Sequence, residues 1–133
     1  MRVLILAALA AAGCQSLRPG TEREAVEAVV ADAVAAALAP ETDADTFMPL
    51  ASADAESSGV LLGRLRAVLD AVRQPDERVS YRVESFEGAP GAATYRLRLA
   101  FRPPMAGADS VGVLVTVACG EGVCRLVRVE RIA

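Results

Sequence analysis

The spacing of apolar residues changes once along this chain, and that change limits the folds it can adopt. Over residues 22–39 and about 58–73, apolar side chains recur every three or four positions, the period of an amphipathic helix. From Arg78 onward they recur at every second position, the period of a strand with one buried face. Helices that come first and strands that come last indicate the α+β class, with the helices gathered on one face of an antiparallel sheet.

Local signals mark the ends of the first helical segment. Thr21 to Glu24 has the form of a capping box, with a hydroxyl at the cap and a carboxylate three residues later, and Pro40 ends the segment. The acidic stretch that follows, residues 41–58, is interpreted as a solvated loop that holds one docked apolar turn. A Ca²⁺ site is the alternative, but no glycine stands at the turn position of a binding loop.

The second helical segment is equally well marked. Either Ser57 or Ser58 is expected to cap its start, and Pro75 stops it. Its apolar residues form a single stripe that is expected to face the core: Leu61, Leu62, Leu65, Val68, Leu69 and Val72.

Four segments of alternating apolar and polar residues follow the helices. Glycine-rich turns at 88–91 and 120–123 join them in pairs, which predicts two consecutive hairpins in a four-stranded antiparallel sheet. Pro103-Pro104 ends the second segment, because proline cannot donate to the hydrogen-bond ladder. The predicted strands cover about 79–84, 94–102, 111–119 and 124–132.

This order of elements resembles the nuclear transport factor 2-like (cystatin-like) superfamily, in which a curved sheet wraps around an opening helix. The closing segment Cys124–Glu130 resembles the last strand of its small members. The resemblance covers Thr21 to Ala133 and implies a cone-like domain, with two N-terminal helices packed on one face of a curved four-stranded sheet. Enzymes with this fold place Asp, Tyr or His in the cone. Here Tyr81 and Tyr95 fall on apolar strand faces and are expected in the core.

The first fourteen residues have the layout of a secretory signal peptide. Arg2 supplies one positive charge, ten apolar residues follow, and Gly13 and Cys14 close the segment. The apolar run is too short to span a bilayer, which takes ~20 residues. A plain signal peptide that leaves Cys14 as an odd thiol, or a buried N-terminal helix, would also account for the pattern.

The tetrapeptide Ala11-Ala12-Gly13-Cys14 resembles the lipobox of bacterial lipoproteins. The resemblance implies that Cys14 receives a diacylglycerol on its sulfur, that the chain is cut before it, and that the new amino terminus is acylated. Gln15, rather than Asp, implies delivery to the outer membrane of a bacterium with two membranes, with the domain facing the periplasm. The chain then divides into a signal peptide at 1–13, a lipidated tether at 14–20 and one α+β domain at 21–133.

Composition excludes several classes of function. The 133 residues are 53% apolar and 23% charged, which excludes a disordered charged tail. With 17 acidic and 14 basic residues the net charge is −3, which offers no case for nucleic-acid binding. The chain has no His, the commonest general base and zinc ligand. No nucleophile motif, phosphate loop or zinc signature is present, so no catalytic residue, metal or cofactor is predicted.

Two cysteines flank the last turn. If Glu121-Gly122 is a two-residue turn, residues whose numbers sum to 243 face each other, which places Cys119 opposite Cys124. Directly opposed strand residues can approach closely enough for a disulfide, and an exported protein meets oxidising conditions. We therefore predict a structural disulfide. A redox pair or a metal site is the alternative, but the chain lacks the Cys-x-x-Cys spacing and the further ligands these need.

The last hairpin is apolar on both faces in this register. One face carries Leu126, Ile132 and four valines, and the other carries Leu114, Val127 and Val129. Either a bulge shifts the register, or something covers the outer face. We expect an interaction face for a second copy or a partner protein, with a helix or loop of the same chain as the alternative. The four valines are Val111, Val113, Val115 and Val117.

Arginines line one face of the second predicted strand. Arg96, Arg98 and Arg102 form a ladder that could face an anion or lipid headgroups, or could simply be a solvated face with cross-strand Arg–Glu pairs. Charge also separates along the chain. Residues 14–77 hold 5 Arg and 12 acids, whereas residues 78–133 hold 8 Arg and 5 acids, a polarity that could orient the domain against an anionic surface.

These features together predict a small envelope lipoprotein that acts as a non-catalytic binding or accessory module. Its expected partners are the membrane, through the N-terminal lipid, and a protein or second copy, through the sheet face. The first alternative is a carrier or sensor of a small apolar ligand or lipid in the cone. The second is an enzyme on the same fold.

Overall fold

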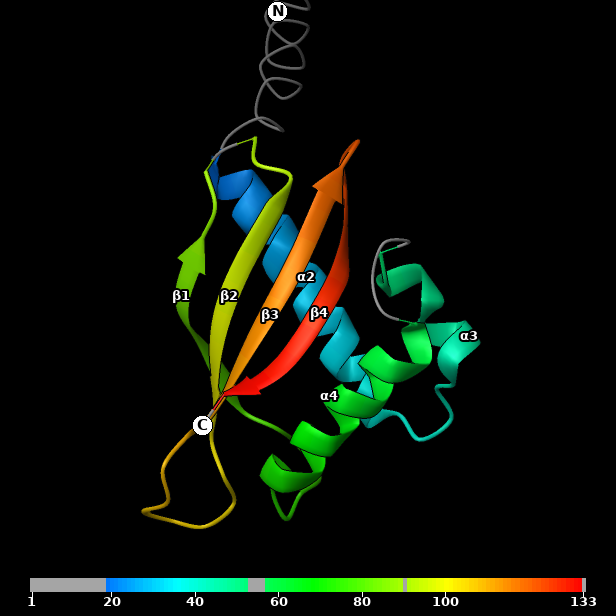
Figure 1. Cartoon of the computed structure of the whole chain (residues 1–133). Helices are drawn as coiled ribbons and strands as arrows, with labels where there is room; N and C mark the ends of the chain where they lie inside the picture. The colour runs from blue at the N-terminus through cyan, green and yellow to red at the C-terminus, as the bar shows by residue number, and fades with distance from the viewer. Residues whose placement is uncertain (1–18, 53–56, 90, 133) are drawn as a thin grey trace, which may run out of the picture.

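The computed structural model of the chain describes residues 19–52, 57–89 and 91–132. Helices come first and strands last, as the change of period predicts (Figure 1). The elements, in chain order, are α2 Pro19–Leu38, α3 Ala44–Phe47, the 3₁₀ helix η1 Met48–Leu50, α4 Ser58–Val72, β1 Tyr81–Glu87, β2 Thr94–Phe101, β3 Val111–Gly120 and β4 Val123–Ile132.

The strands form one antiparallel sheet in the order β1-β2-β3-β4, so every strand pairs with its neighbour in sequence. The helices lie on one face of this curved sheet, with α2 running diagonally behind it and α4 beside β4 (Figure 1). The predicted α+β class, with helices packed on one face of a four-stranded antiparallel sheet, is confirmed.

The start of α2 differs from the prediction. The helix begins at Pro19, so Thr21 lies inside its first turn and cannot be the N-cap of a capping box. Proline suits the first helical position, because its φ angle is already helical and its missing N–H would have no partner there. Pro19 and Gly20, which were expected in the tether, are thus part of α2, and residues 14–18 lie outside the described residues.

Side-chain caps organise the short segment between the long helices. The Asp43 carboxylate accepts a hydrogen bond from the Thr46 amide at 2.8 Å and so caps α3. Phe47 is completely buried, which confirms the docked apolar turn in the acidic stretch. Ser57, the first of the two candidates, caps α4 by accepting a hydrogen bond from the Val60 amide at 3.3 Å.

Arg66 joins the two long helices. Its guanidinium donates to the carbonyl oxygens of Ala37, Ala39 and Thr42, at 3.1, 2.9 and 2.7 Å. These carbonyls lie at the C-terminal end of α2 and just beyond it, where helical carbonyls lack partners within the helix. One side chain on α4 therefore caps α2 and fixes the angle between the helices.

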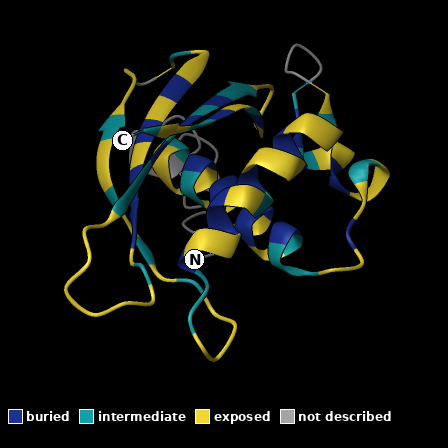
Figure 2. Cartoon of the chain, turned by 60° about the horizontal axis from the view of Figure 1, so that its bottom comes forward, coloured by how far each residue is buried: buried dark blue, intermediate teal, exposed yellow. Residues whose placement is uncertain are grey.

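The core lies between the helices and the inner face of the sheet. Figure 2 shows buried residues on the helical surfaces that face one another, and exposed residues in the loops. The predicted stripe of α4 is buried throughout. The largest fully buried side chains are Tyr95, Phe47, Phe101, Leu61, Leu69, Leu97, Leu99 and Leu126.

A bulge in β4 explains why the last hairpin is apolar on both faces in the register inferred from the sequence. Val117 pairs with Leu126, but Thr116 pairs with Arg128, so Val127 is an extra residue without a partner in β3. Beyond this bulge the faces exchange, which turns Val129 into the core with 1% of its surface exposed.

The predicted interaction face is wrong, because helices of the same chain, the alternative interpretation, cover the inner face of β3. Val113, Val115 and Val117 are at most 2% exposed and pack in the core, and Val111 is half-buried at its margin. Beyond the bulge, the outer row of β4 consists of Arg128, Glu130 and Ile132, and the first two form an ion pair at 3.0 Å. Apolar and polar side chains therefore alternate between the two faces of β4 more regularly than the register without a bulge predicts.

Candidate functional site

An open cleft of about 330 Å³ lies between α2 and β1. Helix α2 packs against β3 and β4, so it leaves the inner face of the edge strand β1 incompletely covered. Apolar side chains form most of the cleft wall, and one carboxylate and one phenol stand beside them. The lining residues are Glu27, Val30, Ala31, Tyr81, Val83 and Leu97.

The two polar groups of the α2–β1 cleft are Glu27, which is ion-paired, and Tyr81, which is protonated. The Glu27 carboxylate binds Arg23 at 2.9 Å, and the Arg23 guanidinium lies 5.0 Å from the centre of the Phe86 ring. Burial, with a further contribution from the negative charge of Glu27, raises the pKa of Tyr81. The phenol therefore stays protonated at neutral pH, where it can donate a hydrogen bond to a bound group.

Two hydrogen bonds to Glu22, together called the Glu22 latch, hold the N-terminal end of α2 beside the sheet. The Glu22 carboxylate accepts a hydrogen bond from the buried Tyr95 hydroxyl and another from the Gly91 amide at 2.8 Å. Glycine is required at position 88, which has a φ of 143°, because the Tyr95 ring packs directly against its backbone. The latch ties the first turn of α2 to the β1–β2 loop.

The latch also shifts the ionisation of both partners. Hydrogen bonds from Tyr95 and from the Gly91 amide lower the pKa of Glu22. The same Tyr95 hydrogen bond, together with burial, raises the pKa of Tyr95 to about 12. Tyr95 is thus a core residue, as predicted, and its hydroxyl serves a structural contact.

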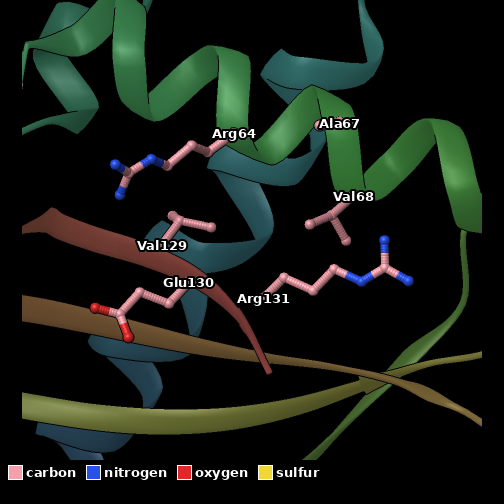
Figure 3. A pocket seen from close by; sticks show the side chains of 6 residues that line it. All are labelled: Arg64, Ala67, Val68, Val129, Glu130 and Arg131. Atoms are coloured by element: carbon pink, nitrogen blue, oxygen red, sulfur yellow. The ribbon is translucent and has the colours of Figure 1, made fainter. Parts of the chain in front are cut away.

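A second open cleft, of about 460 Å³, lies between α4 and β4. Its apolar floor is formed by Ala67, Val68 and Val129, and Figure 3 shows the side chains of Arg64 and Arg131 running along it from opposite elements. Arg131 is on the inner face of an edge strand because of the bulge. A charge in that place discourages pairing with another sheet.

The predicted disulfide is present. Cys119 and Cys124 are bonded, with Cα atoms 4.1 Å apart, at opposed positions of the β3–β4 hairpin. Glu121 and Gly122 both have positive φ angles, of 54° and 80°, as a two-residue hairpin turn of this type requires. The register inferred from the turn is therefore confirmed up to the bulge.

The predicted arginine ladder is shorter than expected. Arg96 and Arg98 project from the outer face of β2, but Arg102 follows the last residue of that strand. Arg98 lies 3.6 Å from Glu84, which also binds Arg82 at 3.2 Å. Arg98 thus belongs to the solvated, ion-paired face that was the alternative interpretation.

Several residues of these sites escaped the sequence interpretation. Glu27 is one of several acidic residues along α2, and Arg131 cannot be assigned to the inner face without the bulge. Nothing in their local spacing marks them, because their role depends on which remote segment lies opposite. Among the residues that the structure describes, no group of three or more His, Cys, Asp or Glu side chains could hold a metal ion.

The membrane-related predictions concern residues outside the described ranges. Cys14 and the apolar run before it are not among the residues described. Within the described part of the chain, no helix has both the length and the apolar character to cross a bilayer.

Comparisons with known proteins identify the fold. No protein-family model matches the chain, and no curated protein matches it in sequence. A solved structure of a designed nuclear transport factor 2-like (NTF2-like) protein superposes with a TM-score of 0.56 at 11% sequence identity. The match covers 84% of this chain and 96% of the designed protein. The fold is NTF2-like.

The NTF2-like fold accounts for the placement of the α2–β1 cleft. A curved sheet that wraps around a diagonal helix contacts it closely at one edge and diverges from it at the other. Here the closely packed edge is β4, and the diverging edge is β1. The expectation drawn from the order of elements is confirmed at the level of the fold.

Proposed function

We propose that this chain is a lipid-anchored envelope lipoprotein whose NTF2-like domain acts by binding, without catalysis. The observation that carries the binding role is the α2–β1 cleft, an open apolar surface with a neutral phenol and an ion-paired carboxylate at its rim. Such a mixture of apolar wall and few polar groups is typical of binding sites. Burial raises the pKa of Tyr81 and keeps its phenol protonated, so that it can donate a hydrogen bond to a bound group.

The anchor is supported by the sequence and by the start of the domain. The lipobox-like motif places the modified residue at Cys14, and α2 begins five residues later at Pro19. Since a residue spans at most ~3.6 Å, the sulfur-bearing residue lies within about 18 Å of the domain. The disulfide supports export, because such bonds persist in oxidising compartments.

Mass spectrometry of the native protein tests the anchor. We expect a mature chain that starts at Cys14 and carries fatty acids, and we expect Cys14→Ser to abolish both the modification and recovery in the membrane fraction. An unmodified N-terminus, or a Cys14 thiol without fatty acid, would overturn the proposal. For the outer-membrane location, we expect Gln15→Asp to move the protein to the other membrane in a density gradient.

Matched substitutions on α2 test the cleft. Ala31 lines it, whereas Ala28 is also exposed on α2 and is not among its lining residues. A photo-crosslinking residue at position 31 is expected to capture one envelope protein in intact cells, and the same residue at position 28 is not. Equal capture from both positions, or capture from neither, would contradict binding at this cleft.

The carrier alternative is favoured by one observation, the size of the cleft. Its volume of about 330 Å³ is at the lower end of small-ligand pockets, which measure roughly 300–1,000 Å³. A carrier should release one small apolar molecule per chain when the native protein is extracted, and Ala31→Trp should abolish that occupancy while Ala28→Trp preserves it. Extraction of a clean chain would leave the accessory binding role as the supported one.

A further inference from the structure

The two layers of the domain carry opposite charge. Residues 14–77 hold 12 of the 17 acidic residues, whereas residues 78–133, which contain the sheet, hold 8 of the 14 arginines. The outer face of the sheet bears five arginines against three glutamates, the latter being Glu84, Glu87 and Glu130. The arginines are Arg82, Arg96, Arg98, Arg125 and Arg128, all exposed.

Three of these arginines gather at one end of the outer face. Arg96 lies across Thr116 from Arg128, and Arg125 occupies the next outward position toward the hairpin tip. Two strand spacings separate Arg96 from Arg128, about 10 Å between their backbones. We call Arg96, Arg125 and Arg128 the arginine patch. Its centre is formed by the small, half-buried side chains of β3.

Two of the three arginines of the patch, Arg96 and Arg125, differ from the other arginines of the outer face in their ion pairing. Arg82 and Arg98 share Glu84, and Arg128 is paired with Glu130. Among the described residues, neither Arg96 nor Arg125 lies within ion-pair distance of an acidic group. Glu87 is opposite Arg96 in the strand register but forms no ion pair with it. Two guanidinium groups here thus remain available to external anions.

The patch lies at the end of the sheet where the described chain begins. Glu22, in the first turn of α2, binds the hydroxyl of Tyr95, and Tyr95 is adjacent to Arg96 in β2. Figure 1 shows the start of α2, the β1–β2 loop and the β3–β4 hairpin together at one end, with the β2–β3 loop at the other. Val123, which is 49% exposed, stands at the tip of that hairpin.

We propose that the arginine patch rests on anionic phospholipid headgroups of the membrane that holds the lipid anchor. The proposal builds on the proposed anchoring through Cys14, which keeps this end of the domain within a short distance of the bilayer. Guanidinium groups bind phosphate oxygens through paired hydrogen bonds, and basic residues are attracted to anionic membrane surfaces. The acidic helical layer would be repelled, so the domain would lie with its sheet toward the membrane. Glu87 and Glu121 oppose the attraction at the margin of the patch.

Tryptophan probes test this orientation, because the chain has no tryptophan of its own. Val123→Trp places a probe beside the patch, and Met105→Trp places one in the exposed β2–β3 loop at the opposite end. Each mature, lipidated variant is reconstituted in vesicles of brominated phosphatidylcholine, with or without phosphatidylglycerol. We expect phosphatidylglycerol to increase quenching at position 123 and to leave position 105 unchanged. Thr94→Trp, on the outer face, is the second probe if Val123→Trp does not fold.

Charge variants complete the test. In the Val123→Trp background, Arg96→Gln with Arg125→Gln should lose the phosphatidylglycerol-dependent quenching. Arg78→Gln with Arg102→Gln removes the same charge from the opposite end and should keep it. The proposal would be overturned if quenching did not depend on phosphatidylglycerol, or if both double variants reduced it equally. Crosslinking of the patch to a second copy would also overturn it. Flotation of the vesicles distinguishes failure of the patch from failure of the anchor. Protein that floats but shows no phosphatidylglycerol-dependent quenching contradicts only the proposal for the patch. Protein that does not float contradicts both the anchor and the patch.

Discussion

At the scale of single residues, two side chains connect segments that are far apart in sequence. Glu22 binds Tyr95 and Gly91 across 73 and 69 positions, and Arg66 reaches back 24 to 29 positions to the end of α2. Both contacts use a charged group against backbone or hydroxyl partners. They hold α2 at its first turn and at its last, so the helix that supports the α2–β1 cleft is fixed at both ends.

The Glu22 latch should make stability depend on pH. Because the pKa of Glu22 is lowered in the folded chain from its usual 4.5, the latch stabilises the fold fully above pH 4.5 and loses this effect as pH falls through the lowered value. We expect Glu22→Gln to be less stable than the parent chain near neutral pH, with a difference that shrinks in acid. Chemical denaturation at a series of pH values measures this. A difference that stays constant down to pH 3 would contradict it.

The same latch should also respond to alkali. The pKa of Tyr95 is about 12 in the folded chain against 10.0 ordinarily, so the folded state holds this proton more tightly. Its contribution to stability is present below pH 10.0 and is lost as pH rises toward 12. Tyr95→Phe, which lacks the titrating hydroxyl, is the control and should show a smaller alkaline loss in the same series.

The hydrogen bonds from Arg66 to the end of α2, called the Arg66 clamp, should stabilise the folded state. Arg66→Ala removes a donor from three carbonyl oxygens, of which the Ala39 oxygen keeps the Thr42 amide at 3.1 Å, and we expect the free energy of unfolding to fall by roughly 2–4 kcal/mol. Arg66→Lys should recover part of this, because an ammonium group cannot match the planar fork. Arg78→Ala is the control, since the Arg78 side chain is 86% exposed. Equal effects at positions 66 and 78 in urea denaturation would show that the clamp contributes nothing.

At the scale of elements, the bulge in β4 decides which side chains enter the core. One extra residue, Val127, exchanges the two faces of the strand, so Val129 and Arg131 turn inward while Arg128 and Glu130 turn outward. The bulge therefore buries an apolar side chain, places a charge beside the α4–β4 cleft, and completes the arginine patch on the other side.

Truncation of the two valines tests the bulge. Val129 is 1% exposed, so Val129→Ala should leave a cavity and lower the free energy of unfolding by about 2 kcal/mol. Val127 is half-buried, so Val127→Ala should cost less than about 1 kcal/mol. Denaturation midpoints of the two variants give the comparison. The reverse order of effects would mean that the strand keeps the unshifted register.

At the scale of the whole molecule, the core closes within one chain. The valines predicted to form an interaction face are covered by the helices of the same chain, and the outer face of the sheet combines charged residues with the half-buried Leu114 and Ile132. The core between the helices and the inner face of the sheet is therefore buried without a second copy.

Thermal unfolding at several protein concentrations tests this independence. For the soluble chain that starts at residue 15, we expect the same Tm over a hundred-fold range of concentration, because no association term enters the unfolding equilibrium. A Tm that rises steadily with concentration would indicate an obligate oligomer.

The sequence by itself determined the fold class, the limits of α4, the order of the strands, the turn of the last hairpin and the Cys119–Cys124 bond. These follow from local periods and from turn chemistry, which act over a few residues. The tertiary structure alone decided the bulge, the inward valines, the Glu22 latch and the α2–β1 cleft. Each of these depends on which remote segment packs opposite, and a one-residue shift in a strand costs little locally while it exchanges every side chain between core and solvent.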